Sequence, residues 1–132
     1  MNGENVNAYL RTEEVGNMAS VSSAVPRVRE KLLSLQRKLA KDMSVVMDGR
    51  DIGTTILPDA DVKIYLTASS LTRAKRRYLE LQEKGTVCDL DNIQKDIEER
   101  DQRDMNREIS PLRQAEDAVL VDSSDLTIEQ VV

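Results

Sequence analysis

The stretch that decides the fold is Ser44–Thr55, which reads SVVMDGRDIGTT. It begins with a short, largely apolar run rich in β-branched residues, and such a run predicts a strand buried on both faces of a parallel sheet. The turn Asp48–Asp51 then places three charges and a glycine where that strand would leave the core. Ligands of open α/β sheets bind beyond the carboxyl ends of the strands, so this turn is a candidate site for a charged ligand. A polar turn with a surface ion pair is the alternative, and the spacing alone leaves both open.

The composition limits the class of protein and the kind of site. The 132 residues carry a net charge of −5, which disfavours a nucleic-acid binder held by bulk electrostatics. There is no histidine, which excludes imidazole acid–base chemistry, and the single Cys88 permits no disulfide within the chain. We find no signal peptide and no apolar run long enough to cross a bilayer. These features predict a cytoplasmic protein with neither a membrane nor a nucleic acid as partner.

The chain alternates between strand and helix patterns, which predicts an α/β fold with a parallel sheet. Strands are predicted near the N-terminus, as a turn followed by a short strand, and at residues 44–47, 62–66 and 118–121. Helices are predicted at 12–24, from Pro26 to the strand at Ser44, from a cap at Ser69 or Ser70 to a stop near Gly85, from Leu90 to the Ser110–Pro111 break, and from a capping box of Thr127 and Gln130.

The helix that begins at Leu90 carries a mixed face. It starts with an apolar stripe, and the same helical spacing then reaches Arg100, Asp104 and Arg107. Charges on a packing face are costly to bury, so we expect this face to open to water or to an anion. Two guanidinium groups that flank a carboxylate suit a phosphate and a hydroxyl, because arginine binds phosphate in a fork and a carboxylate accepts from a hydroxyl.

The alternative for charged helix surfaces is a solvated ladder of ion pairs. We expect Asp101 and Arg103 to belong to such a ladder. The basic run from Arg73 to Arg77 is either solvated or meets a phosphate. A nucleic-acid role for that run is disfavoured, because no aromatic residue stands beside it to stack on bases.

With these features in view, the chain resembles the bacterial cytidylate kinase family of P-loop nucleoside monophosphate kinases. Each matching fragment is weak alone, but their order and spacing are specific. The fragments run nearly end to end and are Asn2–Val6, Glu14–Val15 with Ala19–Ser20, Pro26–Glu30, Asp48–Thr54, Pro58–Ala60, Leu81–Gly85, Glu99–Asp101, Arg103–Asp104, Asn106–Arg107 and Asp122–Ser124.

The resemblance implies transfer of a phosphoryl group from ATP to CMP or dCMP with Mg²⁺, by an enzyme that is a monomer when complete. It also implies a three-layer P-loop kinase core built on a parallel sheet. Residues 1–41 would be the remainder of the monophosphate-binding region, a short strand plus two helices. Residues 42–132 would be a partial kinase core with a mobile lid at about 84–113.

The resemblance further implies a role for particular residues. Those around the cytosine and its sugar would be Ser20, Arg29 and Asp51. Those that grip the acceptor phosphate and ribose would be Arg50, Arg100, Asp104 and Arg107. The catalytic residues would be Asp48, Arg50 and Arg107, with Asp48 near Mg²⁺ without ligating it directly. Arg73 and Arg77 would be the basic residues near the mobile lid.

The chain departs from the family at the donor site. No G-x-x-x-x-G-K-[ST] segment occurs, and Gly49, Gly53 and Gly85 have neither that spacing nor a following lysine. In the family this loop follows a first, central strand, so we expect a C-terminal portion of a cytidylate kinase with a shortened last helix, inactive alone. Two alternatives remain open: a nucleotide-binding module without turnover, and an interaction fragment that associates with another chain through its exposed sheet.

Overall fold

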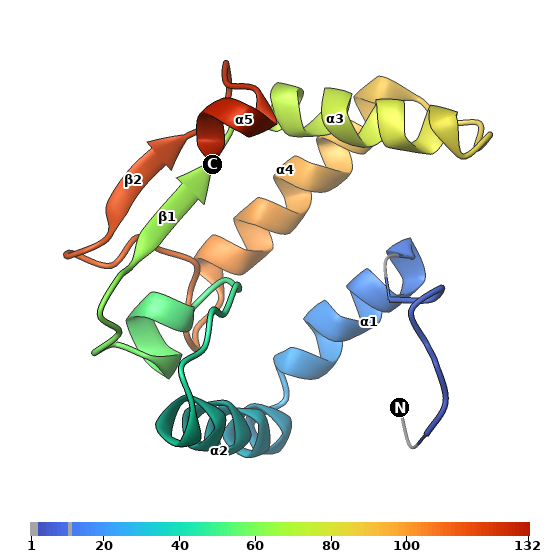
Figure 1. The fold of residues 1–132 in the computed structure, drawn as a ribbon. Coiled ribbons are helices and arrows are strands. Elements are labelled where there is room, and N and C mark those ends of the chain that lie inside the picture. The colour runs from blue at the N-terminus through green and yellow to red at the C-terminus, as the bar shows by residue number, and fades with distance from the viewer. Residues whose placement is uncertain (1–2, 11) are drawn as a thin grey trace. The chain divides into compact units, whose positions relative to one another are not determined.

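The structure, a computed structural model, describes residues 3–10 and 12–132 and divides into two compact units, Met1–Val46 and Met47–Val132. The helices are α1 (Glu13–Ser23), α2 (Pro26–Asp42), η1 (Ile52–Ile56), α3 (Ser70–Glu83), α4 (Leu90–Asn106) and α5 (Ile128–Val131), and the strands are β1 (Ile64–Thr67) and β2 (Val119–Asp122) (Figure 1). The predicted mixed α/β class is therefore confirmed for the described residues. The predicted functional division at residues 41 and 42, and the mobility of the lid, stay predictions.

In the first unit, α1 and α2 form where the sequence predicts helices. The side chain of Thr12 caps α1 by accepting a hydrogen bond from the N–H of Val15 at 3.4 Å. Pro26 opens α2, at a position where a helix leaves the backbone N–H unpaired and a proline therefore loses no bond. Local sequence signals thus fix both helix starts.

The short strand predicted near the N-terminus is wrong for the described residues. Residues 3–10 contain turns and no strand. The N–H of Tyr9 donates to the carbonyl of Val6 at 2.9 Å, and the N–H of Asn7 donates to Oδ1 of Asn5 at 3.0 Å. Asparagine side chains compete with ladder hydrogen bonds in this way. Met1 and Asn2, where the predicted turn begins, lie outside the described residues.

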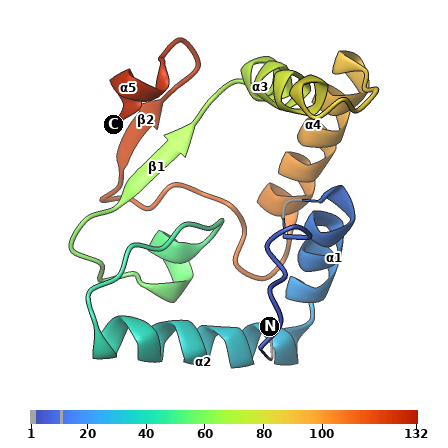
Figure 2. The same cartoon turned by 45° about the vertical axis from the view of Figure 1, so that its right-hand side comes forward.

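In the second unit, β1 and β2 pair in parallel, with Ile64 opposite Val119 and Thr67 opposite Asp122. Both ribbon views show the two arrows side by side (Figures 1 and 2). The predicted strands at 62–66 and 118–121 are confirmed with shifts of one or two residues. Because the pairing is parallel, the carboxyl ends of the two strands lie at the same edge of the sheet.

The strand predicted at Ser44–Met47 is wrong. Its residues have no strand assignment, and the sheet contains only β1 and β2 among the described residues. Val46 is fully exposed. A segment becomes a strand by exchanging backbone hydrogen bonds with a neighbour, and no described segment supplies them here.

The helices of the second unit begin and end at the predicted signals. The Oγ of Ser69 accepts a hydrogen bond from the N–H of Thr72 at 3.1 Å and caps α3. Gly85 follows that helix with a φ of +72°, a left-handed conformation that glycine adopts without steric cost. The capping box of Thr127 and Gln130 opens α5 with both of its reciprocal hydrogen bonds. None of the described helices combines the length and the apolar character needed to cross a membrane.

Few of the described residues are buried. The apolar ones are Ile56, Ala68 and Ala74, and the polar ones are Asp51, Asp104 and Ser123. Polar groups are thus as numerous as apolar ones in the buried set. Buried polar groups require partners, so the surroundings of the two aspartates define the best-organised polar region of this unit.

Candidate functional site

The turn Asp48–Asp51 lies against the C-terminal end of α4. Nε of Arg50 is 3.0 Å from Oδ2 of Asp104, and Nη2 of Arg107 is 3.7 Å from Oδ1 of Asp51. Two ion pairs therefore join the turn to the helix end. In one the turn supplies the arginine, and in the other it supplies the aspartate. Both stretches were predicted separately as candidate sites, and the structure brings four of their candidate residues together.

The carboxylate of Asp104 is buried, with 8% of its side chain exposed, whereas Arg50 is 41% exposed. The two groups are at ion-pair distance. They do not form a hydrogen bond, since Oδ2 of Asp104 has no hydrogen-bond partner among the described residues. This result corrects the prediction that the charged face of the helix is open: at Asp104 the face is covered by the turn. The covered carboxylate keeps an unused acceptor position.

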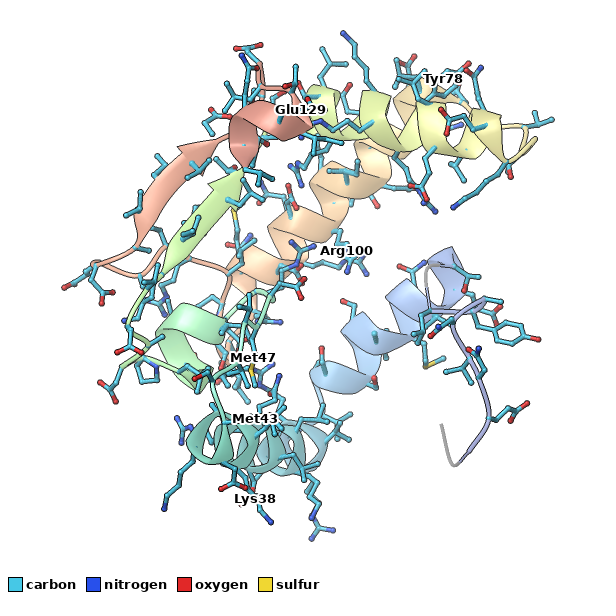
Figure 3. The ribbon with its side chains drawn as sticks, in the orientation of Figure 1. Lys38, Met43, Met47, Tyr78, Arg100 and Glu129 are labelled. Carbon is cyan, nitrogen blue, oxygen red and sulfur yellow. The ribbon has the colours of Figure 1, made fainter. Side chains whose placement is uncertain are left out.

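Two guanidinium groups near this carboxylate also carry unused donors. Nε of Arg100 and Nη2 of Arg107 are buried and have no hydrogen-bond partner among the described residues. Figure 3 shows Arg100 projecting from the middle of α4. A buried charged donor without a partner costs free energy, and phosphate oxygens are the acceptors that satisfy guanidinium groups best.

Arg107 is held by the loop that follows α4. The helix ends at Asn106, and Arg107 has extended backbone angles, φ −64° and ψ 141°. Its Nε donates to the carbonyl of Ser110 at 2.5 Å, and Ser110 has a φ of +53°. The predicted helical stripe therefore holds as far as Asp104, while the loop orients the guanidinium of Arg107.

The backbone of Asp51 is anchored by η1, a π-helical turn that the sequence analysis did not predict. The N–H groups of Thr55 and Ile56 both donate to the carbonyl of Asp51, at 2.9 and 3.1 Å. The N–H of Leu57 donates to the carbonyl of Ile52 at 2.7 Å. π-helical turns are rare and occur often at functional sites. Here the turn fixes the direction in which the chain leaves the charged residues.

Arg73 and Arg77 on α3 have carboxylate partners. The guanidinium of Arg73 meets Asp101 in a fork, at 3.1 and 2.5 Å, and its Nε donates to the carbonyl of Ala68 at 3.0 Å. The hydrogen bond with Asp101 is the main reason that the pKa of Arg73 is raised. Nη1 of Arg77 is 2.9 Å from Glu80. The prediction that Asp101 belongs to an exposed ladder is wrong, because its side chain is only 15% exposed and pairs across to α3.

Ser20 and Arg29 belong to the first unit, where one intermediate residue connects them. Nη1 of Arg29 donates to the carbonyl of Ser23 at 3.5 Å, and Oγ of Ser23 donates to the carbonyl of Ser20 at 3.0 Å. Both residues are partly buried. The two candidates from separate helices are therefore adjacent within this unit.

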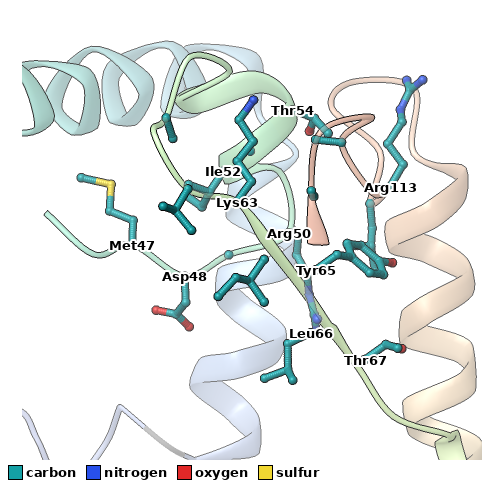
Figure 4. A pocket seen from close by; sticks show the side chains of 18 of the residues that line it. Met47, Asp48, Arg50, Ile52, Thr54, Lys63, Tyr65, Leu66, Thr67 and Arg113 are labelled. Atoms are coloured by element: carbon teal, nitrogen blue, oxygen red, sulfur yellow. The ribbon is translucent and has the colours of Figure 1, made fainter. Parts of the chain in front are cut away.

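A pocket of about 370 Å³ lies in the second unit (Figure 4). Its walls include the turn residues Asp48 and Arg50, the end of β1 at Thr67, and the paired Arg73 and Asp101. Asp48 is exposed. The pocket is thus bordered by the end of a strand, as expected for a ligand site of an α/β protein, and its charged walls come from three elements.

The sequence matches the family model described as cytidylate kinase over residues 1–132. The chain belongs to the cytidylate kinase family. It is 53% identical to a cytidylate kinase of Lactobacillus johnsonii and 52% identical to those of Caldicellulosiruptor saccharolyticus and Enterobacter sp., over all 132 of its residues. It spans 57% or 58% of the length of these relatives.

Cytidylate kinases act with Mg²⁺ and ATP in general, as kinases do. Within residues 3–10 and 12–132, no group of three or more metal-ligating side chains lies together. Mg²⁺ in kinases is held largely by substrate phosphates and water, with one or two protein carboxylates. The described residues therefore do not form a coordination site by themselves, and Asp48 is the exposed carboxylate that borders the pocket beside the site.

Sequence reasoning missed three side chains that organise this cytidylate kinase chain. Arg76 donates to Oγ and to the carbonyl of Ser123, which ties α3 to the end of β2. Lys63 and Asp117 form an ion pair of 2.7 Å between the starts of the two strands. A run of basic residues on a helix does not reveal which one is paired, but a lysine within the apolar run predicted as a strand at residues 62–66 was a sequence signal that Lys63 needs a partner.

Proposed function

We propose that this chain forms the acceptor-binding portion of a cytidylate kinase, which transfers the terminal phosphoryl group of ATP to CMP or dCMP. A phosphate oxygen of the acceptor attacks the terminal phosphorus, the bond to the bridging oxygen breaks, and ADP leaves with CDP or dCDP. The acceptor phosphate is already a nucleophile, so the reaction needs no strong base. This requirement agrees with a chain that has no histidine.

The observation that carries the proposal is a set of buried charged atoms near the end of α4 that make no hydrogen bond within the described residues. These atoms are Nε of Arg100, Nη2 of Arg107 and Oδ2 of Asp104, of which the last two are in ion pairs with Asp51 and Arg50. A nucleoside monophosphate can supply the missing hydrogen bonds, because its phosphate accepts and its sugar hydroxyls donate. Hydrogen bonds to the nucleotide would therefore offset the free-energy cost of burying these atoms without them.

The remaining roles follow from this assignment. Arg50 and Arg107 would align the acceptor phosphate and stabilise charge on the transferred group, which is the main source of catalysis in phosphoryl transfer. Asp51, with Ser20 and Arg29, would recognise cytosine and its sugar. Arg29→Ala should therefore reduce the preference for CMP over UMP, measured as the ratio of kcat/KM values.

On the donor side, Arg73 and Arg77 would contact the phosphates of ATP. In the structure both guanidinium groups hold carboxylates, which are anions of similar geometry. Asp48 would act on Mg²⁺ through water and not as a direct ligand. The ion would be held mainly by the phosphates of ATP and by water.

The experiment compares two proteins. One is the 132-residue chain itself, and the other is a chimera in which these residues replace the 132 matching residues of the Lactobacillus johnsonii cytidylate kinase. A coupled assay should show CMP phosphorylation by the chimera. The chain alone should show none, because its sequence contains no G-x-x-x-x-G-K-[ST] loop for the ATP phosphates. An inactive chimera, or equal turnover by both proteins, would contradict the proposal.

A second candidate is an interaction fragment that pairs with another chain through the sheet. The observation in its favour is the exposure of apolar strand residues, including Ile64 at 64% and Val119 at 63%. Such surfaces promote association. Sedimentation of the 132-residue chain would support this candidate if the mass rises with concentration and CMP does not bind.

A further inference from the structure

Lys63 is a buried lysine at the start of the sheet, with only 7% of its side chain exposed. Its Nζ donates to the carbonyl of Pro58 and to both carboxylate oxygens of Asp117, the latter at 2.9 and 2.7 Å. An ammonium group that leaves water requires such partners. We call these three residues the Lys63 clamp. The clamp joins the segment that enters β1, the turn that follows η1, and the turn that precedes β2.

The aliphatic stem of Lys63 lies close to η1. Gly53 has no side chain, but a Cβ added to it would lie 3.4 Å from Cδ and 3.7 Å from Cγ of Lys63. Ile52, Gly53 and Lys63 all line the pocket shown in Figure 4. The lysine stem therefore lies beside the middle of η1, near Gly53, and its ammonium group is hydrogen-bonded just beyond the end of η1, to the carbonyl of Pro58.

The position of η1 matters because its backbone holds the charged turn. The carbonyl of Asp51 accepts from two N–H groups of η1, and Asp51 is the residue whose side chain faces Arg107. A shift of η1 would therefore move Asp51 and the adjacent Arg50. Sub-ångström placement of binding groups decides how well a charged ligand is held.

We propose that Lys63 is a positioning residue, which holds η1 in place and thereby keeps Arg50 and Asp51 in the geometry that binds the acceptor nucleotide. Lys63 does not bind the nucleotide itself, because its ammonium group is occupied by Pro58 and Asp117. The role in binding rests on the proposed function, whereas the support of η1 does not. The hydrogen bond from Lys63 is the main reason that the pKa of Asp117 is lowered.

Hydrogen exchange on the 132-residue chain tests the support of η1 without any ligand. Lys63→Met keeps the stem but removes the ammonium group. It should speed exchange at the amides of Thr55, Ile56 and Leu57 about tenfold or more relative to amides of α3. Lys95→Met is the matched control, because Lys95 is 74% exposed on α4, and it should leave those amides unchanged. Asp117→Asn removes the other half of the ion pair and should act in the same direction if Lys63→Met does not fold.

Kinetics of the chimera test the role in binding. Lys63→Met should raise the KM for CMP about tenfold and change the KM for ATP less than twofold, and Lys63→Arg should restore part of the loss. In an Arg50→Ala background the same substitution should have a much smaller effect, because its action runs through Arg50 and Asp51.

The outcomes separate the two claims. Unchanged exchange at Thr55–Leu57 in both clamp variants overturns the proposal. Faster exchange with an unchanged KM for CMP, or with equal changes in both KM values, overturns the positioning role and leaves a general structural one. If the unmodified chimera does not phosphorylate CMP, the proposed function fails, and the exchange result alone decides whether the clamp supports η1.

Discussion

The charged site and the two-stranded sheet belong to the same unit, yet the charged residues of the site are buried and apolar residues of the sheet are exposed. Asp51 and Asp104 are 8% and 6% exposed, whereas Ile64 and Leu66 of β1 are 64% and 60% exposed. Charged groups normally face water and strand residues normally pack, so the order is reversed in this unit.

This difference in burial indicates which interactions hold this part of the chain together. Each aspartate at the site has an arginine partner from the other side of the contact, while the apolar strand faces have little to pack against within the described residues. Paired charges, and not apolar packing, therefore set the arrangement of the turn and the end of α4. Substitutions at the site should have large effects, and matched substitutions on the sheet or on exposed helix faces should have small ones.

The largest effect should come from the site itself. In the chimera, Arg107→Ala should lower kcat/KM for CMP by about 10²- to 10³-fold, because Arg107 is proposed to align the acceptor phosphate and to stabilise charge on the transferred group. Arg103→Ala should change it less than about threefold, since Arg103 is exposed on α4. Similar losses for the two variants would mean that the functional face of the helix is assigned wrongly.

The free energy of unfolding of two variants tests directly whether the site or the sheet contributes more to stability. Asp104→Asn removes the buried charge opposite Arg50 and should lower the free energy of unfolding by about 2 kcal/mol, less than for a fully buried pair because Arg50 is partly hydrated. Ile64→Thr on the exposed sheet should change it by less than about 0.5 kcal/mol. Urea denaturation of the two variants measures both values. A larger loss for Ile64→Thr would reverse the conclusion about what organises the unit.

The helix starts and ends could be predicted from the sequence because their causes are local. Thr12, Ser69 and the Thr127 capping box each act on backbone groups three residues away, and Gly85 needs only its own freedom of φ. The strand at Ser44–Met47 could not be predicted correctly, since a strand needs a neighbour and its own sequence does not reveal whether one is present.

The site could be predicted as a set of residues but not as a set of contacts. Helical spacing places Arg100 and Asp104 on one face, and a turn rich in charge identifies Asp48–Asp51. That Arg50 meets Asp104 depends on how two distant segments pack, and periodicity contains no such information. The same reason explains why Asp101 was assigned to an exposed ladder, although it pairs with Arg73 on another helix.

The ion pair of Arg73 on α3 with Asp101 on α4 is partly buried. It tests how strongly burial affects the contribution of a charged pair to stability. Asp101→Asn loses one side of a forked contact with Arg73, whose side chain is 34% exposed. It should lower the free energy of unfolding by about 1 kcal/mol, because hydration of Arg73 recovers part of the loss. Glu99→Gln is the matched control on the same helix, at a 4.0 Å pair with Lys95, and should cost less than about 0.5 kcal/mol. Equal effects in urea denaturation would show that burial does not set the strength of these pairs.

The smallest effect should come from a partly exposed network at the C-terminal end of α3. Hydrogen bonds from Lys84 and then from Arg77 lower the pKa of Glu80 from 4.5 to about 2. A carboxylate whose pKa is lower in the folded state adds stability above its unfolded pKa, and this stability is lost as the pH falls through the folded pKa. The difference in Tm between the original chain and Glu80→Gln should therefore be present at pH 6, shrink between about pH 4.5 and 2, and also shrink with added salt, because solvent ions screen exposed pairs. Glu83→Gln, one turn further along the same exposed helix surface, is the control and should show no such pH dependence. A Tm difference for Glu80→Gln that stays constant from pH 6 to pH 2 would show that its effect does not come from these charges.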